Sequence, residues 1–420
     1  MTRPLLALLH HRVGLPWIFE AAEREGVDLL FIPRPGDTTA PPATEVLIGD
    51  ALTDPDTLLA ALADRRPDGI LTMYDPAVPF AARAAAALGL PGVSEDAARR
   101  AVDKRALRES LAAAGANTPG YATVLPGGAT DRAARLRFPV VVKPAAGFSS
   151  LGVVRVDHPD ELPAALRQVE AVAAQQLPAS AAARGTVVEE FVAGAEYAVE
   201  SFVHAGRTHV LSVGFKGEPK GPYFEEGVYR APAVLRDDVL AAIVAEAALA
   251  NAALGISTGP VHTELRLRDG ETPFVFDVGA RIGGSGVSHF IVAESAGIDL
   301  AAESIRAAIG RPPISLPPLP AHIGTPSATA GEPPMIAHAG NYIVQTGGTG
   351  RIASIDGLAE AATHPAVRHV AQFLFPGDEV RAYPEFSGYP AFILSVHPTA
   401  AALEAFHQHL DDSITVRYAR

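Results

Sequence analysis

Short apolar runs alternate with helix-like segments over the first 95 residues. The apolar runs are LLALL (5–9), VDLLFIP (27–33), EVLIG (45–49) and DGILTMYD (68–75). The segments between and after them, 16–25, 54–66 and 79–88, are predicted to be helices. Alternation of this kind predicts a parallel, doubly wound sheet. His10 and His11 end the first run, at the edge where such sheets bind ligands, although a structural role is more common for such residues.

The composition excludes several classes of protein. Lys and Arg number 34 against 47 Asp and Glu, a net charge of −13, so no nucleic-acid partner is expected. The absence of cysteine excludes disulfides, cysteine-ligated metals and thiol nucleophiles. No stretch is long and apolar enough for a signal peptide or a membrane span, so we expect a cytoplasmic protein without a membrane partner. The length of 420 residues suits about two to four domains.

The rest of the chain has a different character. Hairpin-like strands dominate after residue 120, and an alanine-rich helix is predicted over 237–254. The proline cluster RPPISLPPLP (311–320) predicts a linker. Beyond it, the patterns predict strands near 341–346 and 390–396, a helix over 399–410 and a strand over 413–418. We therefore predict an α/β (α+β) protein with three domains: 1–95, 96–315 and a small C-terminal α+β domain, 316–420.

The first segment suited to chemistry is KPAAGFSSLGV (143–153), where an apolar strand ends in Lys143 and a loop of small residues follows. Small side chains let backbone N–H groups approach phosphate oxygens. Ser149 and Ser150 add hydroxyl donors, and Lys143 adds a positive charge. The same residues also suit a flexible hairpin with a solvated lysine. The sequence contains no Walker A loop, so any phosphate site must be of another type.

The second segment is the acidic strand end TVVEEFV (186–192), followed by Glu196 after a turn. A strand end with free backbone groups near Glu189, Phe191 and Val192 suits the edge of an adenine ring. A carboxylate such as Glu196 can accept hydrogen bonds from ribose hydroxyls. A solvated acidic strand end is the alternative interpretation.

The third segment is a hairpin that carries Glu264 in VHTELRL and Asp277 in PFVFDVGAR. Adjacent strands can point both carboxylates to one face. Two like charges side by side need a cation, and Mg²⁺ with nucleotide phosphates suits hard carboxylate oxygens. Arg281 is then placed to neutralise a transferring phosphoryl group, or instead forms an ion pair at the strand edge. His262 shares the face of Glu264, where it contacts substrate or is only structural.

The order of these pieces resembles the ATP-grasp superfamily over about residues 90–300. SEDAARRAVDK resembles the helix before the grasp domain, FPVVVKP and SSLGV the phosphate lid, VVEEFVAGAEYAVES the adenine linker, and HTEL with FDVGARIGGSG the metal strands. The resemblance implies an ATP-grasp fold over 96–315 with a mobile lid over about 120–190. It implies these roles: Lys104, Lys143, Ser149 and Ser150 at the ATP phosphates, Glu189, Phe191 and Val192 at adenine, Glu196 at ribose, Glu264 and Asp277 at Mg²⁺ or Mn²⁺, and Arg281 with Lys143 in catalysis.

Within the superfamily the chain looks most like the L-amino-acid ligases, which make dipeptides. YFEEGVYRAP (223–232) resembles their substrate loop, and GTGRIASIDGL with FPGDEV resembles their extra C-terminal domain. The substrate residues implied are Glu225, Glu226, Arg230, His262, Gly283 and Gly284. Gly279 departs from the Asn of many ATP-grasp enzymes, which leaves the number of Mg²⁺ ions open. Val228 departs from a His of some dipeptide ligases.

These features predict an ADP-forming carboxylate–amine ligase that joins amino acids, or an amino acid and a related carboxylate, into a dipeptide-like amide through an acyl phosphate. ATP and Mg²⁺ or Mn²⁺ would be its cofactors and small molecules its partners, and a homodimer is the family expectation. Two alternatives stay open. One is a ligase of the same fold with another carboxylate and an amine or thiol. The other is a nucleotide-binding protein without turnover, which Gly279 favours.

Overall fold

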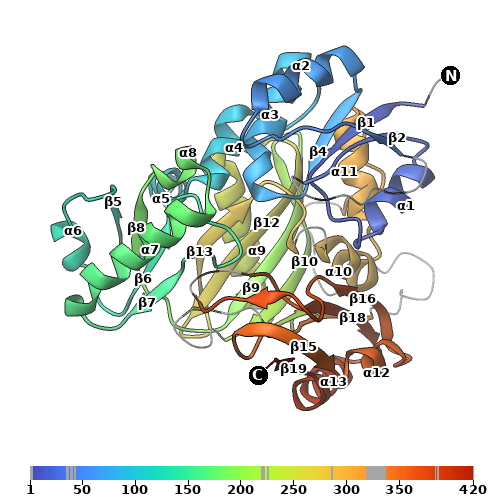
Figure 1. Cartoon of the computed structure of the whole chain (residues 1–420). Helices are drawn as coiled ribbons and strands as arrows, with labels where there is room; N and C mark the ends of the chain where they lie inside the picture. Colours follow the sequence, from blue (N-terminus) through green and yellow to red (C-terminus); the bar gives the residue numbers. More distant parts are fainter. Residues whose placement is uncertain are drawn as a thin grey trace.

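The chain opens with the parallel sheet that its strand–helix alternation predicts (Figure 1). The computed structural model describes residues 3–34, 37, 41, 44–218, 223–224, 227–284, 287–317, 337–383, 385 and 387–419. The sheet has the order β3-β2-β1-β4, and all its neighbours run parallel. Its elements are β1 (Leu5–Leu9), α1 (Trp17–Arg24), β2 (Asp28–Ile32), β3 (Glu45–Val46), α2 (Pro55–Arg65), β4 (Gly69–Thr72), a 3₁₀ turn (Asp75–Ala77) and α3 (Val78–Leu88).

Helices cover both faces of this sheet, which confirms the doubly wound arrangement. Apolar side chains of α2 and α3 pack on one face, and those of α1 and α11 (Leu300–Ala308) pack on the other. The strand predicted over 45–49 is shorter than expected. Only Glu45 and Val46 pair with β2 as a strand, and Ile48 beyond them is 79% exposed.

The helix predicted after Ser94 is in fact two helices. The Ser94 hydroxyl accepts the N–H of Ala97 at 3.2 Å and caps α4 (Glu95–Val102). Asp103 is extended and accepts the N–H of Arg105 at 3.1 Å, which caps α5 (Lys104–Ala113). The expectation that Asp103 and Lys104 lie inside one helix is therefore wrong. The break places Lys104 in the first turn of a new helix.

Residues 121–190 form a separate four-stranded antiparallel sheet, in the position of the predicted lid (Figure 1). The strand order is β5-β8-β6-β7, and Val140, Val142 and Val188 pack against helix α7. The elements are β5 (Tyr121–Val124), α6 (Asp131–Ala134), β6 (Val140–Pro144), β7 (Val154–Val156), a 3₁₀ turn (Pro159–Glu161), α7 (Leu162–Gln176), α8 (Ala179–Ala182) and β8 (Thr186–Glu190). The mobility of this lid stays a prediction.

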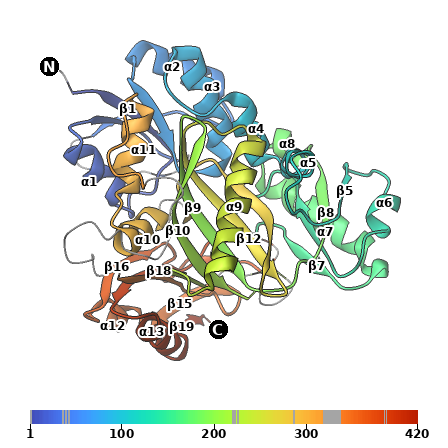
Figure 2. The ribbon, with the colours of Figure 1, turned by 180° about the vertical axis from the view of Figure 1, so that it is seen from behind.

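A large antiparallel sheet forms the centre of the molecule, with the order β13-β12-β9-β10-β11-β14-β18-β16. Helix α9 (Asp237–Leu254) covers one face of it, as Figure 2 shows, and α10 (Val287–Ala296) and α11 pack on the other. Its strands are β9 (Glu196–His204), β10 (Arg207–Gly217), β11 (Val228–Ala231), β12 (Gly259–Arg268), β13 (Thr272–Gly279), β14 (His338–Ile343), β16 (Val367–Gln372) and β18 (Ala391–His397).

The predicted C-terminal domain shares this sheet with the central domain. β11 pairs with β14, with Val228 opposite Tyr342, so hydrogen bonds cross the predicted linker. Part of that linker, 318–320, lies outside the described residues. The remaining elements are β15 (Gly350–Asp356), α12 (Leu358–Ala362), β17 (Glu379–Val380), α13 (Ala400–Ser413) and β19 (Thr415–Tyr418). In the described part of the chain, no helix combines the length and apolar character that a membrane crossing requires. The boundaries at 95 and 315 stay predictions.

Candidate active site

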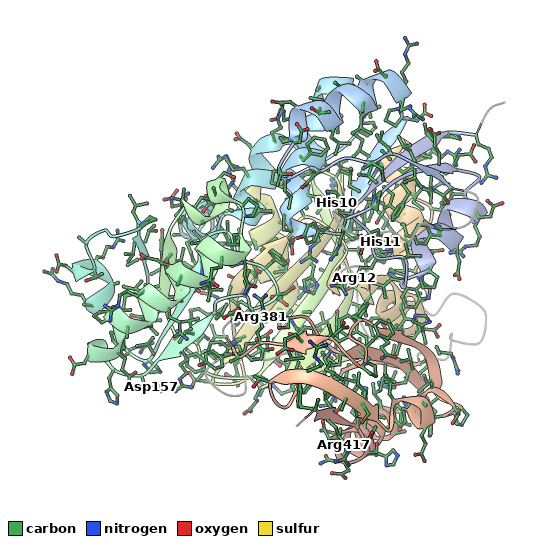
Figure 3. The ribbon with its side chains drawn as sticks, in the orientation of Figure 1. His10, His11, Arg12, Asp157, Arg381 and Arg417 are labelled. Carbon is green, nitrogen blue, oxygen red and sulfur yellow. The ribbon has the colours of Figure 1, made fainter. Side chains whose placement is uncertain are left out.

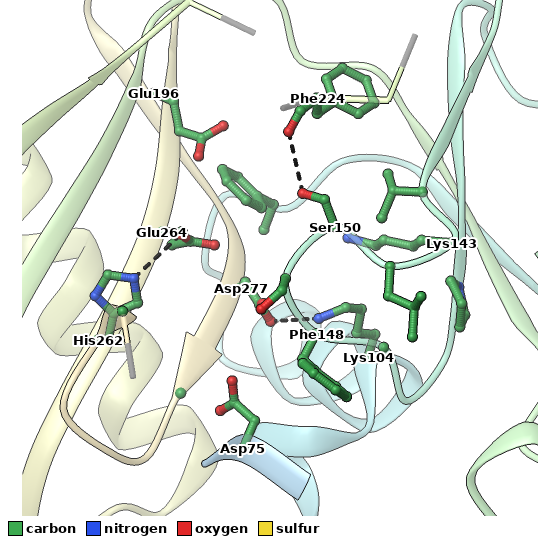
Figure 4. Close-up of a pocket in the computed structure, with 18 of the residues that line it drawn as sticks. Asp75, Lys104, Lys143, Phe148, Ser150, Glu196, Phe224, His262, Glu264 and Asp277 are labelled. Carbon is green, nitrogen blue, oxygen red and sulfur yellow. Dashed lines mark hydrogen bonds and ion pairs between the residues drawn. The ribbon is translucent and has the colours of Figure 1, made fainter. Parts of the chain in front are cut away.

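One cavity collects most of the residues that the sequence singled out (Figure 4). The lid, the large sheet, the carboxyl edge of the N-terminal sheet and the C-terminal segment all contribute to its walls. The predicted residues that line it are Lys104, Lys143, Ser149, Ser150, Glu189, Val192, Glu196, His262, Glu264, Asp277, Arg281 and Gly284. Phe191, Arg230 and Gly283 are described but do not line it. Glu225 and Glu226 lie outside the described residues.

Glu264 and Asp277 lie directly opposite each other on β12 and β13. The pairing shifts by one residue next to them, since Leu265 pairs with Val275, and this shift is a β-bulge. Because of the bulge, Val275 and Val278 both reach the core beneath α9 although they are three residues apart. Asp277 is thereby turned to the cavity, on the same side as Glu264.

Each of these two carboxylates contacts a lysine. Lys104 Nζ lies 2.8 Å from Asp277 Oδ1 (Figure 4), and the Lys216 ammonium pairs with Glu264. Burial disfavours the charge of Lys104, but the attraction of Asp277 outweighs it and raises the pKa of the lysine. Burial also disfavours the charge of Glu264, but Lys216 and His262 hold its pKa well below the ordinary value.

His262 joins Glu264 to a second, deeper acid. Its Nε2 lies 3.3 Å from Glu264 Oε1, and its Nδ1 lies 2.6 Å from Glu200 Oε1. Glu200 also accepts hydrogen bonds from the hydroxyls of Tyr229 at 2.8 Å and Ser288 at 2.6 Å. Burial disfavours the imidazolium, but Glu200 and Glu264 outweigh it and raise the pKa of His262 to about 10. The histidine is thus tied into the structure and also lines the cavity.

Arg281 forms an ion pair with Asp75, which lies in the turn after β4. Arg281 Nε donates to Asp75 Oδ1 at 2.5 Å, and burial of the guanidinium is outweighed by this acid, which raises its pKa. Gly279 leaves room for the pair, because a Cβ there would lie 3.3 Å from Asp75 Oδ1 and 3.4 Å from Arg281 Cζ. The carboxylate of Asp75 therefore approaches the place where many ATP-grasp enzymes carry an Asn side chain.

The small-residue loop after Lys143 is bent in an unusual way. Ser149 and Ser150 have φ of 50° and 54°, in the left-handed region that side chains other than glycine rarely adopt. Such a conformation costs on the order of 1–3 kcal/mol per residue and occurs where the surroundings impose it. Ser150 Oγ donates to the carbonyl of Phe224 at 3.3 Å (Figure 4). The loop and Lys143 together line the lid side of the cavity.

Glu189 has two buried cations for partners. Arg108 Nε lies 2.7 Å and Lys143 Nζ 2.8 Å from its oxygens, and Glu189 is 3% exposed. Burial favours its neutral form, but Arg108 and Lys143 outweigh burial and lower its pKa to about 2. Burial lowers the pKa of Lys143 to about 8, although Glu189 opposes the shift. A carboxylate engaged in this way holds Lys143 in place, and its contact with adenine stays a prediction.

The other residues expected at the nucleoside lie near one arginine, Arg266. Its guanidinium contacts Glu196 at 3.1 Å and the carbonyl of Val192 at 3.4 Å, and both of these residues line the cavity. The ring of Phe191 instead stacks on Phe224, with ring centroids 5.9 Å apart. Val192 and Glu196 thus remain candidates for nucleoside contacts, whereas Phe191 supports the wall behind them.

Two residues expected to bind substrate do not line this cavity. Arg230 on β11 pairs with Glu404 of α13 at 3.0 Å and stacks over Phe215, away from the cavity. At Gly283 a Cβ would lie 2.3 Å from His262 Nδ1, so only glycine lets the backbone pass this close. Gly284 does line the cavity.

The charged residues of this site without a sequence prediction include Asp75, Arg108, Lys216 and Arg266. Lys216 and Arg266 stand among the apolar residues of β10 and β12, and a charged residue inside a strand was the available signal for both. Arg108 is one of several charged residues of α5, and Asp75 lies in a turn. Nothing local distinguishes these two from solvated residues.

The donor set fits a magnesium nucleotide. Among the described residues, no three His, Asp or Glu side chains gather into a complete metal site. Mg²⁺ is commonly held by one or two carboxylates, with phosphate and water oxygens for the other positions. Glu264 and Asp277 match this pattern, and the ammonium groups of Lys104 and Lys143 suit phosphate oxygens.

Three family models match the chain. An ATP-grasp N-terminal domain matches residues 19–92, an ATP-grasp domain matches 136–289, and L-amino acid ligase C-terminal domain 2 matches 343–419. The crystal structure of L-amino acid ligase from Bacillus licheniformis is 38% identical, with a TM-score of 0.84 and full coverage of both chains. Phosphoribosylglycinamide synthetase from Anaerococcus prevotii, 18% identical over 99% of this chain and all of its own, has a TM-score of 0.69 and supports the fold alone.

Two curated relatives are longer than the regions they share with the chain. Uncharacterized protein y4rH of Sinorhizobium fredii is 26% identical over 77% of this chain, which spans 63% of the relative. ATP-grasp enzyme fsqD of Aspergillus fumigatus is 31% identical over 38% of this chain, which spans 29% of that enzyme. The fold and the matches define an enzyme of the ADP-forming carbon–nitrogen ligase class, whose usual cofactors are ATP and Mg²⁺. The chain belongs to the ATP-grasp superfamily and stands close to the L-amino-acid ligases.

Proposed function

We propose that this protein joins two amino acids, or an amino acid and a related carboxylate, into a dipeptide-like amide, with ATP converted to ADP and phosphate. The observation that carries the proposal is the placement of Glu264 and Asp277 as opposite partners on the cavity wall, with Lys143 and Arg281 on the same cavity. The 38% identity with an L-amino acid ligase over the whole chain supports the choice of amino acids.

In the first step, a carboxylate oxygen of one substrate attacks the γ-phosphorus of ATP. The bond from this phosphorus to the β–γ bridging oxygen breaks, ADP leaves and an acyl phosphate forms. Mg²⁺ held by Glu264 and Asp277 would neutralise charge on the phosphates. Lys143 and Lys104 bind phosphate oxygens, and Arg281 faces the charge that develops during transfer. Asp75 orients Arg281 through their ion pair.

In the second step, the amine of the other substrate attacks the acyl carbon, phosphate leaves, and the nitrogen loses a proton. Water competes with the amine for the acyl phosphate, so the site must be closed during this step. The lid loop is suited to this task, since Phe148 meets Tyr74 of the N-terminal domain edge-on, with ring centroids 5.6 Å apart. This contact would connect the lid with the far side of the cavity.

The test is to incubate the purified protein with ATP, Mg²⁺ and pooled L-amino acids, and to measure ADP release and product masses. We expect ADP release that depends on amino acids and products whose mass is the sum of two amino acids minus water. Asp277→Asn is the matched inactive control. ADP release with carboxylates that lack an amino group, and none with amino acids, would instead indicate another ligase of this fold. Nucleotide binding without any ADP release would indicate a protein without turnover.

That the protein forms a homodimer also stays a prediction. Light scattering of the purified chain measures it directly, and a mass near 43.7 kDa would show a monomer instead.

A further inference from the structure

Two arginines line the end of the cavity that lies under the N-terminal sheet. Arg12 and Arg34 follow β1 and β2, and both strands run parallel, so the two residues emerge at the same carboxyl edge. Figure 3 shows Arg12 below His10 and His11, between the N-terminal sheet and the C-terminal strands. His10 and His11 are buried, and each lies within hydrogen-bond distance of a backbone carbonyl. Of this run, Arg12 is the residue that reaches the cavity.

These two arginines differ from the other basic residues on the cavity wall. Among the described lining residues, the other four lysines and arginines are each paired with a carboxylate: Lys104 with Asp277, Lys143 with Glu189, Arg266 with Glu196 and Arg281 with Asp75. No carboxylate in the described ranges forms an ion pair with Arg12 or Arg34. Burial lowers the pKa of Arg12 to about 10, the neighbouring charge of Arg34 acts in the same direction, and the charge of Asp37 opposes the shift in part. Two like charges placed together in this way favour an anion between them.

The guanidinium carbon of each arginine lies over an aromatic ring. Arg12 Cζ lies 4.5 Å from the ring centroid of Phe373, and Arg34 Cζ lies 4.4 Å from that of Tyr74. Arg34 Nε also donates to the carbonyl of His10 at 2.9 Å. Stacking occupies the face of a guanidinium and leaves its in-plane N–H groups for a planar anion such as a carboxylate.

The surroundings indicate what such an anion would belong to. Met73, Tyr74, Phe373, Tyr389 and Phe392 line the same cavity and give this end apolar and aromatic walls. Tyr74 precedes Asp75, the partner of Arg281, so this end adjoins the proposed reaction centre. A small organic acid with an apolar part therefore suits it better than a free inorganic anion.

We infer that Arg12 and Arg34 bind a substrate carboxylate that the ligation leaves unchanged. The inference rests on the proposed function, in which one carboxylate is consumed at the Arg281 end and another persists into the product. The persisting carboxylate has two sources: the α-carboxylate of the amino acid that supplies the amine, or an acidic side chain. Both present the same planar anion to the arginines.

Binding measured without turnover tests this inference. Calorimetry would compare two pairs of probes, L-alanine with L-alaninamide and L-glutamate with L-glutamine, in the presence of Mg²⁺ and a non-hydrolysable ATP analogue. We expect the wild-type protein to bind the member with the additional carboxylate at least about tenfold more tightly in one pair. The alanine pair identifies the α-carboxylate as the source, and the glutamate pair identifies an acidic side chain.

The variants R12Q and R34Q should reduce that preference to less than about threefold, whereas R12K and R34K should retain part of it. R268Q is the matched control, because Arg268 also stacks on an aromatic ring, Phe274 at 3.8 Å, but does not line the cavity. Equal binding within both pairs by the wild type, or an unchanged preference in R12Q and R34Q, overturns the inference. A failure of the proposed function can be told apart from a failure of this inference. The first appears as the absence of product in the mass assay, and the second appears in the calorimetry.

Discussion

Two walls of the cavity carry acids, and the acids are handled differently. On the lid wall, Glu189 is buried and engaged by both Arg108 and Lys143. On the wall formed by the large sheet, Glu264 and Asp277 lie side by side and both line the cavity. The first wall surrounds one carboxylate with two cations. The second places two carboxylates opposite each other, with Lys104 on Asp277 and with Lys216 and His262 on Glu264.

Both glutamates have cationic partners, and the difference is that Glu264 has a second carboxylate, Asp277, opposite it on the neighbouring strand. Cations placed beyond Glu189 keep its pKa at about 2 and fix the direction of Lys143. The register of β12 and β13 instead opens two acids to the same space. Glu189 should therefore matter mainly for stability, and Glu264 with Asp277 mainly for turnover.

The largest effect is expected on the wall of the large sheet. Asp277→Asn or Glu264→Gln should lower kcat by on the order of 1000-fold or more, because metal-based charge stabilisation supplies several kcal/mol. Turnover measured over a range of Mg²⁺ and Mn²⁺ concentrations checks this. Full activity in Asp277→Asn would contradict a metal role for the pair.

Loss of the lid lysine should come next. Lys143→Ala should weaken ATP binding and turnover by a factor on the order of 10–1000, since it removes one charge-assisted phosphate contact. Nucleotide titration and steady-state rates measure the two effects. Arg137→Ala is the matched control in the lid, because that side chain is 70% exposed. An unchanged affinity for ATP and an unchanged turnover rate would show that Lys143 has only a structural role in the cavity wall.

The free energy of unfolding should depend more on the lid wall than on the wall of the large sheet, which is the reverse of the order expected for turnover. Glu189→Gln should lower the free energy of unfolding by about 3 kcal/mol, because two buried cations lose their countercharge. Glu190→Gln, next to it on β8, should change it by less than about 1 kcal/mol, since its partner Arg137 is exposed. Urea unfolding compares the two variants with the wild type. An equal effect of both variants would contradict the division between the walls.

The same measurement at low pH sharpens this prediction. Glu189 has a folded-state pKa of about 2 against an ordinary 4.5, so its contribution is present above about pH 4.5 and is lost as the pH falls towards 2. The stability difference between wild type and Glu189→Gln should therefore shrink over that range. A constant difference would show that the charge of Glu189 is not its source.

The smallest effect is a pH dependence of ATP use. Lys143 binds phosphate in its protonated form, and its pKa is lowered to about 8, so kcat/KM for ATP should fall above pH 8 by up to about tenfold per pH unit. Lys143→Arg should move this fall to higher pH. A profile that stays flat to pH 9.5 would contradict the assignment.

Local patterns predicted much of the fold. The helix over 237–254 has the predicted bounds, and the first two strands differ from prediction by at most one residue at each end. The pairing of the two strands that carry Glu264 and Asp277 also follows from the sequence, because a short hairpin joins them, but its register alone would place Glu264 opposite Phe276. The bulge that places Asp277 opposite Glu264 does not follow from the sequence, since no turn or strand pattern there marks it.

What the sequence by itself determined is therefore the set of elements and the chemistry carried by each one, because periodicity, caps and tight turns act over a few residues. Only the tertiary structure decided which charges meet. Arg108 reaches Glu189 across 81 positions, and Arg281 reaches Asp75 across 206. It also joined β11 to β14 across the predicted linker and left Arg12 and Arg34 together on the cavity wall. Such partners are chosen by the packing of distant segments, and no local pattern records them.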